Sequence, residues 1–381
     1  MPYFDNNSTT PLDPVAREVL VDALANSWAN PSSPYRSSAI VRASIQKCRE
    51  MIGTRIGVSP DLITFTSGAT EANNSVFCHL ARNSSSTSRV LLSPFEHPSV
   101  AEAAHFWFSN RVDFLKAQPN GMISIEELEK YLKEQKLTVL VSVLAASNES
   151  GVIQPWSEVA RLCNSFKVKY HCDSTQLPGK EALENLNQCS FSVSSAHKFG
   201  GPKGIGWLVG ENTSSLILGG EQEKGRRGGT ENYPSILAAC SAWKSNVETS
   251  INISELSKYR DDFEERMNEI FPEIRFIGRN SPRLWNTSLF ILPRFENLAL
   301  VGKLDKLGFQ VSTGSACSTF KDGGSAIAKA MGFSSSEMKC LIRVSSFQSH
   351  TRFDWNGLTS AFEQAIKELE EDSSHSPVIS I

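Results

Sequence analysis

Long apolar runs are missing from this 381-residue sequence, and so is a recognisable leader. The longest apolar stretch, Leu137–Ala146, is too short to cross a bilayer. The opening residues, MPYFDNNSTTPLDP, have neither the basic start nor the apolar core of a secretory signal. These absences predict a cytoplasmic protein with no membrane partner.

Metal-binding cysteine patterns and an excess of positive charge are missing as well. The eight cysteines form no CxxC pair and no zinc-like spacing, so we expect reduced thiols and no metal site. Lys and Arg number 38 against 41 Asp and Glu, a net charge of −3. This balance disfavours a nucleic-acid partner, which positive charge would have to hold through its phosphates.

Strand-like and helix-like segments alternate through the first two-thirds of the chain. We expect strands at 62–66, 137–146, 168–172 and 191–194. We expect helices from Thr70, over 124–136 after the capping box at Ser124, and over 157–164 with Ser157 as the cap. This order predicts an α/β fold with a largely parallel sheet between helices.

The pattern changes after about residue 250. Helices are expected at 254–270, at 297–306 and in a last amphipathic segment with Leu358, Phe362, Ile366 and Leu369, and strands at 285–292 and 341–347. The sequence therefore predicts a large domain of residues 14–250, whose central sheet is mostly parallel and flanked by helices. Residues 1–13 and 251–381 are expected to form a smaller α/β domain.

A glycine turn, Thr66-Ser-Gly-Ala-Thr-Glu71, follows the first expected strand. Gly68 permits close backbone approach, Thr70 offers a hydroxyl, and the helix that follows presents free N–H groups to an anion. The plain alternative is a helix cap. The segment lacks the GxGxxG and GxxxxGK(S/T) patterns, so it does not indicate a nucleotide site.

Lys198 follows the expected strand at 191–194 and precedes the glycine pair Gly200-Gly201. The glycines have no side chains and so leave room beside the lysine. A lysine becomes a nucleophile when it is desolvated or lies near another cation. An exposed loop lysine is the alternative, and we assign that role to Lys203.

Asp173 lies at the tip of the expected strand at 168–172. A buried aspartate is costly unless it is paired, and a protonated pyridine nitrogen, such as that of pyridoxal phosphate, is a suitable partner. The alternative is an N-cap for a following helix.

Cys317 lies in Ser312–Thr319, among small polar residues that cannot bury it. An exposed thiol in such a loop is a candidate nucleophile. We assign the other seven cysteines to packing.

These segments together resemble the cysteine desulfurases, the class V aminotransferase branch of the fold-type I pyridoxal phosphate enzymes. The likeness extends from Tyr3–Asn7 to Ile342–Ser345, which is almost the whole chain. The resemblance implies the type I fold and a homodimer.

The resemblance also implies which residues hold pyridoxal 5′-phosphate. Lys198 would bind it covalently and shuttle the Cα proton, Asp173 would pair with the ring nitrogen, and His97 would stack on the ring and assist proton transfer. Gln176 would bond the ring hydroxyl, and Thr230 would reach the phosphate of the partner subunit. The other implied cofactor contacts are Ala69, Thr70, Asn148, Ser195 and His197.

The implied reaction converts L-cysteine to L-alanine. Asn30, Asn148 and Arg343 would contact the substrate, and Arg343 would hold its carboxylate through two hydrogen bonds. The Cys317 thiolate would attack the substrate sulfur, leaving a persulfide for a sulfur acceptor, either a protein or a small molecule. The long loop between Cys317 and 330–332 is similar to that of members with a mobile cysteine arm.

Two other functions are compatible with the sequence. One is another class V enzyme, such as a selenocysteine lyase, a C–S lyase or a specialised biosynthetic enzyme; Cys317 argues against the simple lyases, which need no exposed thiol there. The other is a cofactor-free binding protein. It is disfavoured by the joint presence of Thr70, His97, Asp173, Gln176 and Lys198.

Overall fold

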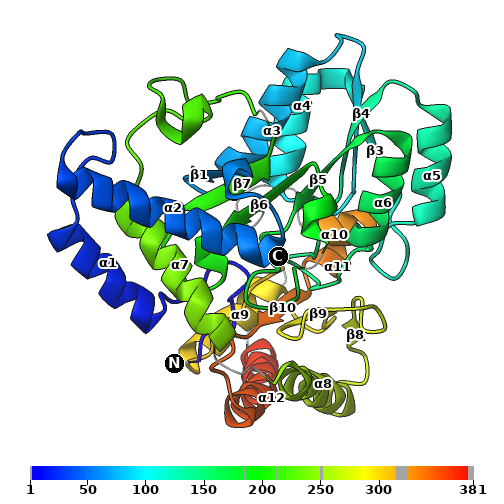
Figure 1. The fold of residues 1–381 in the computed structure, drawn as a ribbon. Helices are drawn as coiled ribbons and strands as arrows, with labels where there is room; N and C mark the ends of the chain where they lie inside the picture. The colour runs from blue at the N-terminus through cyan, green and yellow to red at the C-terminus, as the bar shows by residue number, and fades with distance from the viewer. Residues whose placement is uncertain (1, 184, 212, 249–251, 315–324, 376–381) are drawn as a thin grey trace, which may run out of the picture.

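The computed structural model describes residues 2–183, 185–211, 213–248, 252–314 and 325–375. These residues form two α/β units that lie side by side (Figure 1). Within the described ranges, no helix is both long and apolar enough to cross a membrane.

The larger unit is built on a seven-stranded sheet in the order β1-β7-β6-β5-β4-β2-β3. Its strands are β1 (Ile63–Thr66), β2 (Arg89–Leu92), β3 (Val112–Phe114), β4 (Thr138–Ser142), β5 (Lys169–Asp173), β6 (Phe191–Ser195) and β7 (Gly206–Gly210). Only β7 runs against the others, antiparallel to β1 and β6. The predicted mostly parallel sheet is confirmed, and the carboxyl ends of β1, β2, β4, β5 and β6 meet at one edge.

Helices cover both faces of this sheet (Figure 1). They are α1 (Pro14–Asn26), α2 (Arg36–Ile56), α3 (Ala69–Asn83), α4 (Pro98–Phe108), α5 (Ile125–Glu134), α6 (Trp156–Phe166) and α7 (Tyr233–Glu248). Val90 and Leu92 join the core beneath α3 and α4, whereas Leu91 joins the core on the opposite face. This alternation follows from the period of two along a strand.

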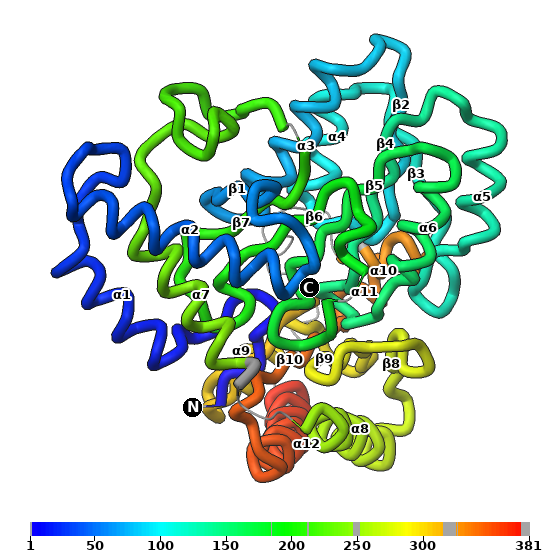
Figure 2. Tube along the Cα trace, in the orientation of Figure 1, coloured from blue at the N-terminus to red at the C-terminus, as the bar shows by residue number. Residues whose placement is uncertain are grey.

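The smaller unit has an antiparallel sheet in the order β10-β9-β8. Its elements are α8 (Ile253–Ile270), β8 (Arg275–Phe276), β9 (Thr287–Ile291), α9 (Asn297–Lys306), α10 (Ala326–Ala330), α11 (Ser335–Met338), β10 (Leu341–Ser345) and α12 (Arg352–His375). Phe4 packs in its core, and Asp5 pairs with Ser345 at the edge of β10. Figure 2 shows the N-terminal segment before α1 running beside this unit.

The capping residues predicted for helices α6 and α5 were only partly correct. Helix α6 begins at Trp156, so Ser157 lies in its first turn and caps nothing. At α5, Ser124 Oγ accepts from the Glu127 N–H as predicted. The Glu127 carboxylate instead accepts from the N–H of Lys116, so only half of the capping box forms.

A buried carboxylate ties α8 to the small sheet. Glu264 is fully buried, and its two oxygens lie 2.7 and 3.0 Å from the Arg283 guanidinium. Glu264 Oε1 also accepts from Ser288 Oγ on β9 at 2.7 Å. Removing one partner of a buried ion pair leaves the other charge uncompensated.

We therefore expect Glu264→Ala to lower the free energy of unfolding by about 3 kcal/mol, measured by denaturant unfolding. Glu265→Ala, at the next and exposed position of α8, is the matched control and should change it by less than about 0.5 kcal/mol. Equal losses in the two variants would contradict a structural role for the buried pair.

Candidate functional site

One cavity of about 480 Å³ opens at the carboxyl edge of the large sheet. Loops that follow β1, β2, β4, β5 and β6 form its walls, and the N-terminal segment adds Ser8 and Thr9. The predicted site residues that line it are Ala69, Thr70, His97, Asn148, Asp173, Gln176, Ser195, His197 and Lys198. Residues from five separate loops thus face a single space.

Lys198 reaches the cavity from a single 3-10 turn, Ala196–Lys198, that directly continues β6. Its Nζ donates to the carbonyl oxygens of Asn7 at 2.6 Å and Ser8 at 2.8 Å. These two contacts hold the amine at the edge of the cavity, beside the N-terminal segment. Lys203 also lines the cavity, and it is exposed as expected.

Asp173 ends β5, the strand next to β6, and is only 7% exposed. Its Oδ1 accepts from the Thr175 N–H at 3.0 Å and its Oδ2 from Asn73 Nδ2 at 3.1 Å. No helix begins at this residue, so the N-cap alternative is wrong. No Lys, Arg or His of the described ranges forms an ion pair with this carboxylate, which suits it to a cationic ligand.

The turn between β1 and α3 faces the same cavity. Gly68 is the N-cap of α3 with φ 150°, a conformation that favours glycine, and a Cβ there would lie 3.3 Å from Ser195 Oγ. A glycine N-cap supplies no side chain to the first helical N–H groups. Together with Thr70 and Ser195, these donors can hold an anion.

His97 is the N-cap of α4, and its Nδ1 accepts from the Ser99 N–H at 3.1 Å. Burial lowers the pKa of His97, although the nearby Asp173 acts in the opposite direction. In the neutral ring the hydrogen is therefore on Nε2, because Nδ1 serves as an acceptor. His97 can thus exchange a proton through a ring whose orientation is fixed.

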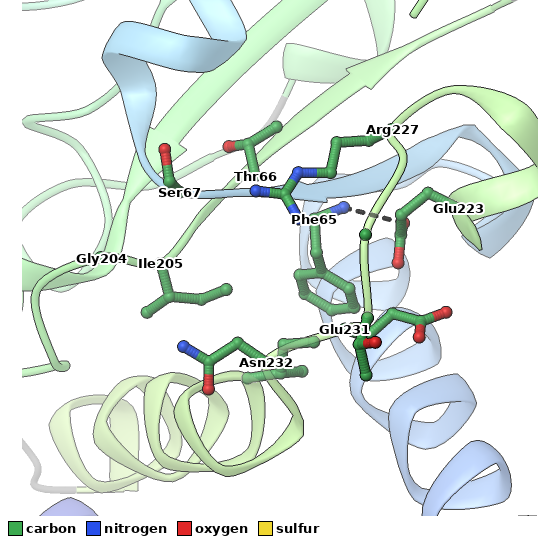
Figure 3. Close-up of a pocket in the computed structure, with 12 residues that line it drawn as sticks. Phe65, Thr66, Ser67, Gly204, Ile205, Glu223, Arg227, Glu231 and Asn232 are labelled. Atoms are coloured by element: carbon green, nitrogen blue, oxygen red, sulfur yellow. Dashed lines mark hydrogen bonds between the residues drawn. The ribbon is translucent and has the colours of Figure 1, made fainter. Parts of the chain in front are cut away.

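Thr230 lines a second cavity of about 230 Å³, which shares Ser67 and Gly204 with the first. Figure 3 shows Arg227 extending over the β1 end near Ser67, and the Phe65 N–H donating to Glu223. Arg227 also pairs with Glu71 on α3 at 3.0 Å. Thr230 itself is exposed, where a second copy of the chain can reach it.

Besides Thr230, three predicted residues do not line the first cavity or are not among the described residues. Asn30 is exposed, and its Oδ1 accepts from the Ser32 N–H at 2.9 Å. Arg343, on β10, contacts two cavity residues, Ser8 Oγ at 2.6 Å and Asn148 O at 3.1 Å. Cys317 is not among the described residues.

A buried polar cluster beneath the site escaped the sequence analysis. Asn73 Nδ2 donates to Asp173 Oδ2 at 3.1 Å and to Ser99 Oγ at 2.9 Å, so one amide contacts both the aspartate and the turn of His97. Asn73 Oδ1 accepts from His171 Nε2 at 3.0 Å. The only signal in the sequence is an asparagine inside a helix, one turn after Ala69, where it is a poor helix former.

The aminotransferase class-V family model matches residues 2–354. A cysteine desulfurase IscS of Dictyoglomus turgidum is 33% identical over 326 residues, which cover 83% of this chain and 82% of that protein. A cysteine desulfurase of the same type from Archaeoglobus fulgidus is 34% identical over 328 residues, 84% of this chain and 85% of that protein. A solved structure of a NifS-like protein aligns with a TM-score of 0.88 at 28% identity, covering 97% of this chain and 99% of the other. These matches confirm the predicted family and fold class.

The buried His171 makes stability depend on pH. Burial lowers its pKa to about 4, so the folded protein keeps the ring neutral while the unfolded chain takes up a proton near pH 6.5. Its stabilising contribution is therefore complete above pH 6.5 and is lost as the pH falls towards 4.

We expect His171→Gln to be destabilised at pH 7.5, and its deficit relative to the parent to shrink by about 2 kcal/mol at pH 5. Denaturant unfolding at both pH values measures this difference. His105→Gln, at an exposed position on α4, is the matched control for the loss of a histidine. A deficit that does not vary with pH would contradict the prediction.

Proposed function

Because the chain belongs to the aminotransferase class-V family, we propose that it is a pyridoxal 5′-phosphate-dependent cysteine desulfurase, which converts L-cysteine to L-alanine. The observation that carries this proposal is that Lys198 and Asp173 line one cavity from the ends of adjacent strands. The cysteine desulfurase relatives support the choice of substrate.

The polar groups around the cavity fit this cofactor. Thr175 Oγ1 is buried there without a hydrogen-bond partner among the described atoms, as expected where a polar ligand belongs. The residues that would hold the cofactor are Ala69, Thr70, His97, Asn148, Asp173, Gln176, Ser195, His197 and Lys198, with Thr230 supplied by a second copy. When bound, the cofactor supplies an electron sink for the Cα of the amino acid.

Lys198 and His97 carry the proton transfers. The Lys198 amine binds the cofactor and, once the substrate has displaced it, removes the Cα proton. The lowered pKa of His97 favours a neutral ring at pH 7, which can take up a proton and then return it.

Arg343 binds the substrate carboxylate. Its guanidinium contacts Ser8 and Asn148, two residues that line the cavity. Its Nη2 contacts Asp5 Oδ1 at 2.5 Å and Ser8 Oγ at 2.6 Å, which fixes the guanidinium plane. Arg343 Nε is buried with no acceptor in the described part of the chain, as expected where a polar ligand belongs.

Cys317 takes the sulfur. Its thiolate forms an S–S bond with the substrate sulfur as the C–S bond breaks, and the electron pair of that bond goes to the carbon skeleton, which is protonated to alanine. The described residues on either side of Cys317 in the sequence contact residues of the site. Ser312 pairs with Arg343 on one side, and Ser325 contacts Glu149, the neighbour of Asn148, on the other.

The persulfide then passes to a sulfur acceptor, a protein or a small molecule. A cytoplasmic location suits this thiol chemistry, and the seven described cysteines are all free. Cys240 Sγ lies 4.0 Å from the carbonyl of Cys48 without a disulfide between the two residues.

A homodimer is part of the proposal, because Thr230 reaches the partner's phosphate. Large apolar side chains are exposed on and near α1 and α2, the helices beside α7 in Figure 1. They include Val21, Leu24, Trp28, Tyr35 and Ile40, with Trp28 81% exposed. A cluster of this kind is typical of a protein interface.

We expect Trp28→Asp to shift the protein from dimer to monomer in sedimentation analysis and to weaken retention of the cofactor at least about tenfold. Phe106→Asp removes a similarly exposed side chain, 76% exposed on α4, and should leave the dimer intact. A dimer that persists with Trp28→Asp argues against this interface.

The catalytic proposal is tested by incubating the purified protein with L-cysteine. We expect alanine and one added sulfur atom on the Cys317 peptide, detected by mass spectrometry. Cys317→Ser should lower alanine formation by about 100-fold or more, because the sulfur has no acceptor, whereas Cys340→Ser should not. A direct lyase would keep turning over L-cysteine without Cys317, and that result would exclude the persulfide mechanism.

A further inference from the structure

Lys180 lies buried directly behind the site, and nothing in the proposed reaction uses it. The side chain is only 4% exposed, and no Asp or Glu of the described segments forms an ion pair with it. Its Nζ donates to Gln176 Oε1 and, at 3.4 Å, to Asn7 Oδ1. Gln176 lines the cavity, whereas Lys180 and Asn7 do not, so Lys180 forms a second layer of the wall.

Burial makes a charged amine unfavourable at this position. It lowers the pKa of Lys180 well below the ordinary value, and the positive charges of Lys198 and Arg343 act in the same direction. A neutral amine still donates hydrogen bonds, so its contact with Gln176 does not require the charge.

The contacts of Gln176 leave one orientation for its amide. Nε2 donates to the backbone carbonyl of Asn7 at 3.2 Å, and a carbonyl oxygen can only accept. Oε1 therefore lies on the side of Lys180 and is occupied by its N–H. One N–H of the Gln176 amide remains for the cavity, where the phenolic oxygen of pyridoxal phosphate is an acceptor.

We infer that Lys180 is a positioning residue, which holds the Gln176 amide with its NH₂ group towards the cofactor. This inference rests on the proposed cofactor but not on the substrate or on Cys317. A donor on the phenolic oxygen withdraws negative charge from it and so makes the nitrogen joined to Lys198 a weaker base. Without Lys180 only the Asn7 carbonyl holds the amide, which can then turn away from the cofactor, and that nitrogen should become more basic.

The test is a pH titration of the visible absorbance of the bound cofactor, which needs no turnover. Lys180→Met removes the donor but keeps the volume, and we expect the midpoint to rise by about 0.5 to 1 pH unit. Lys180→Gln retains an N–H donor and should restore most of the parent value. Lys130→Met, at an exposed position on α5, controls for the loss of a lysine.

A double-mutant cycle separates positioning from a direct effect of charge. Gln176→Leu should raise the midpoint by itself, and adding Lys180→Met should then change it by less than about 0.2 pH unit, because both residues act through one hydrogen bond. Additive shifts, or an unchanged midpoint with Lys180→Met, would overturn the inference. Lys180→Leu carries the same prediction if Lys180→Met does not fold.

The inference and the proposed function fail differently. If the parent protein binds the cofactor but forms no alanine, the proposed reaction is contradicted. The double-mutant cycle of Lys180 and Gln176 then still tests whether Lys180 is a positioning residue. A parent protein that shows no absorbance from a cofactor joined to Lys198 overturns both.

Discussion

The site depends on two neighbouring parallel strands that end side by side. Residues 171–173 of β5 pair with residues 191–193 of β6, and each strand ends within a few residues of this paired stretch. Asp173 therefore lies at the end of one strand and Lys198 one turn beyond the other. Because both strands are buried and hydrogen-bonded on both sides, a carboxylate and an amine are held at a separation that loops alone would not fix.

Asn7 connects this edge of the sheet to the smaller unit. Its backbone carbonyl accepts from Lys198 and Gln176, and its Oδ1 accepts from Asn286 at 3.0 Å and from Lys180 at 3.4 Å. Its Nδ2 donates to Asn148 O at 3.1 Å and Thr287 Oγ1 at 2.9 Å. One fully buried residue thus links the N-terminal segment, the cavity wall and β9, and every polar atom of its side chain is used.

The sequence predicted those features that local composition determines. Apolar runs located β1, β5 and β6, and the chemistry of a lysine and an aspartate at strand ends identified Lys198 and Asp173. The antiparallel direction of β7 was not predicted, since it depends on the tight return after Lys198 rather than on residue type. Residues such as Asn7 and Lys180 could not be identified either, because Asn7 contacts Lys180 and Thr287, which lie 173 and 280 residues further along the chain, and their own neighbours give no periodic signal.

The order of synthesis also bears on the site. Asp5 and Ser8 contact Arg343, and the Asn6 N–H donates to the Ser345 carbonyl, so this segment binds a strand that is synthesised more than 330 residues later. Within the described residues the large sheet has no strand beyond β7 and can form earlier. Asn7, whose carbonyl accepts from Lys198, is bonded to Thr287 on β9 and Ser345 on β10, so this acceptor is fixed only after those strands have emerged. A nascent chain therefore carries Lys198 before it carries a complete pocket.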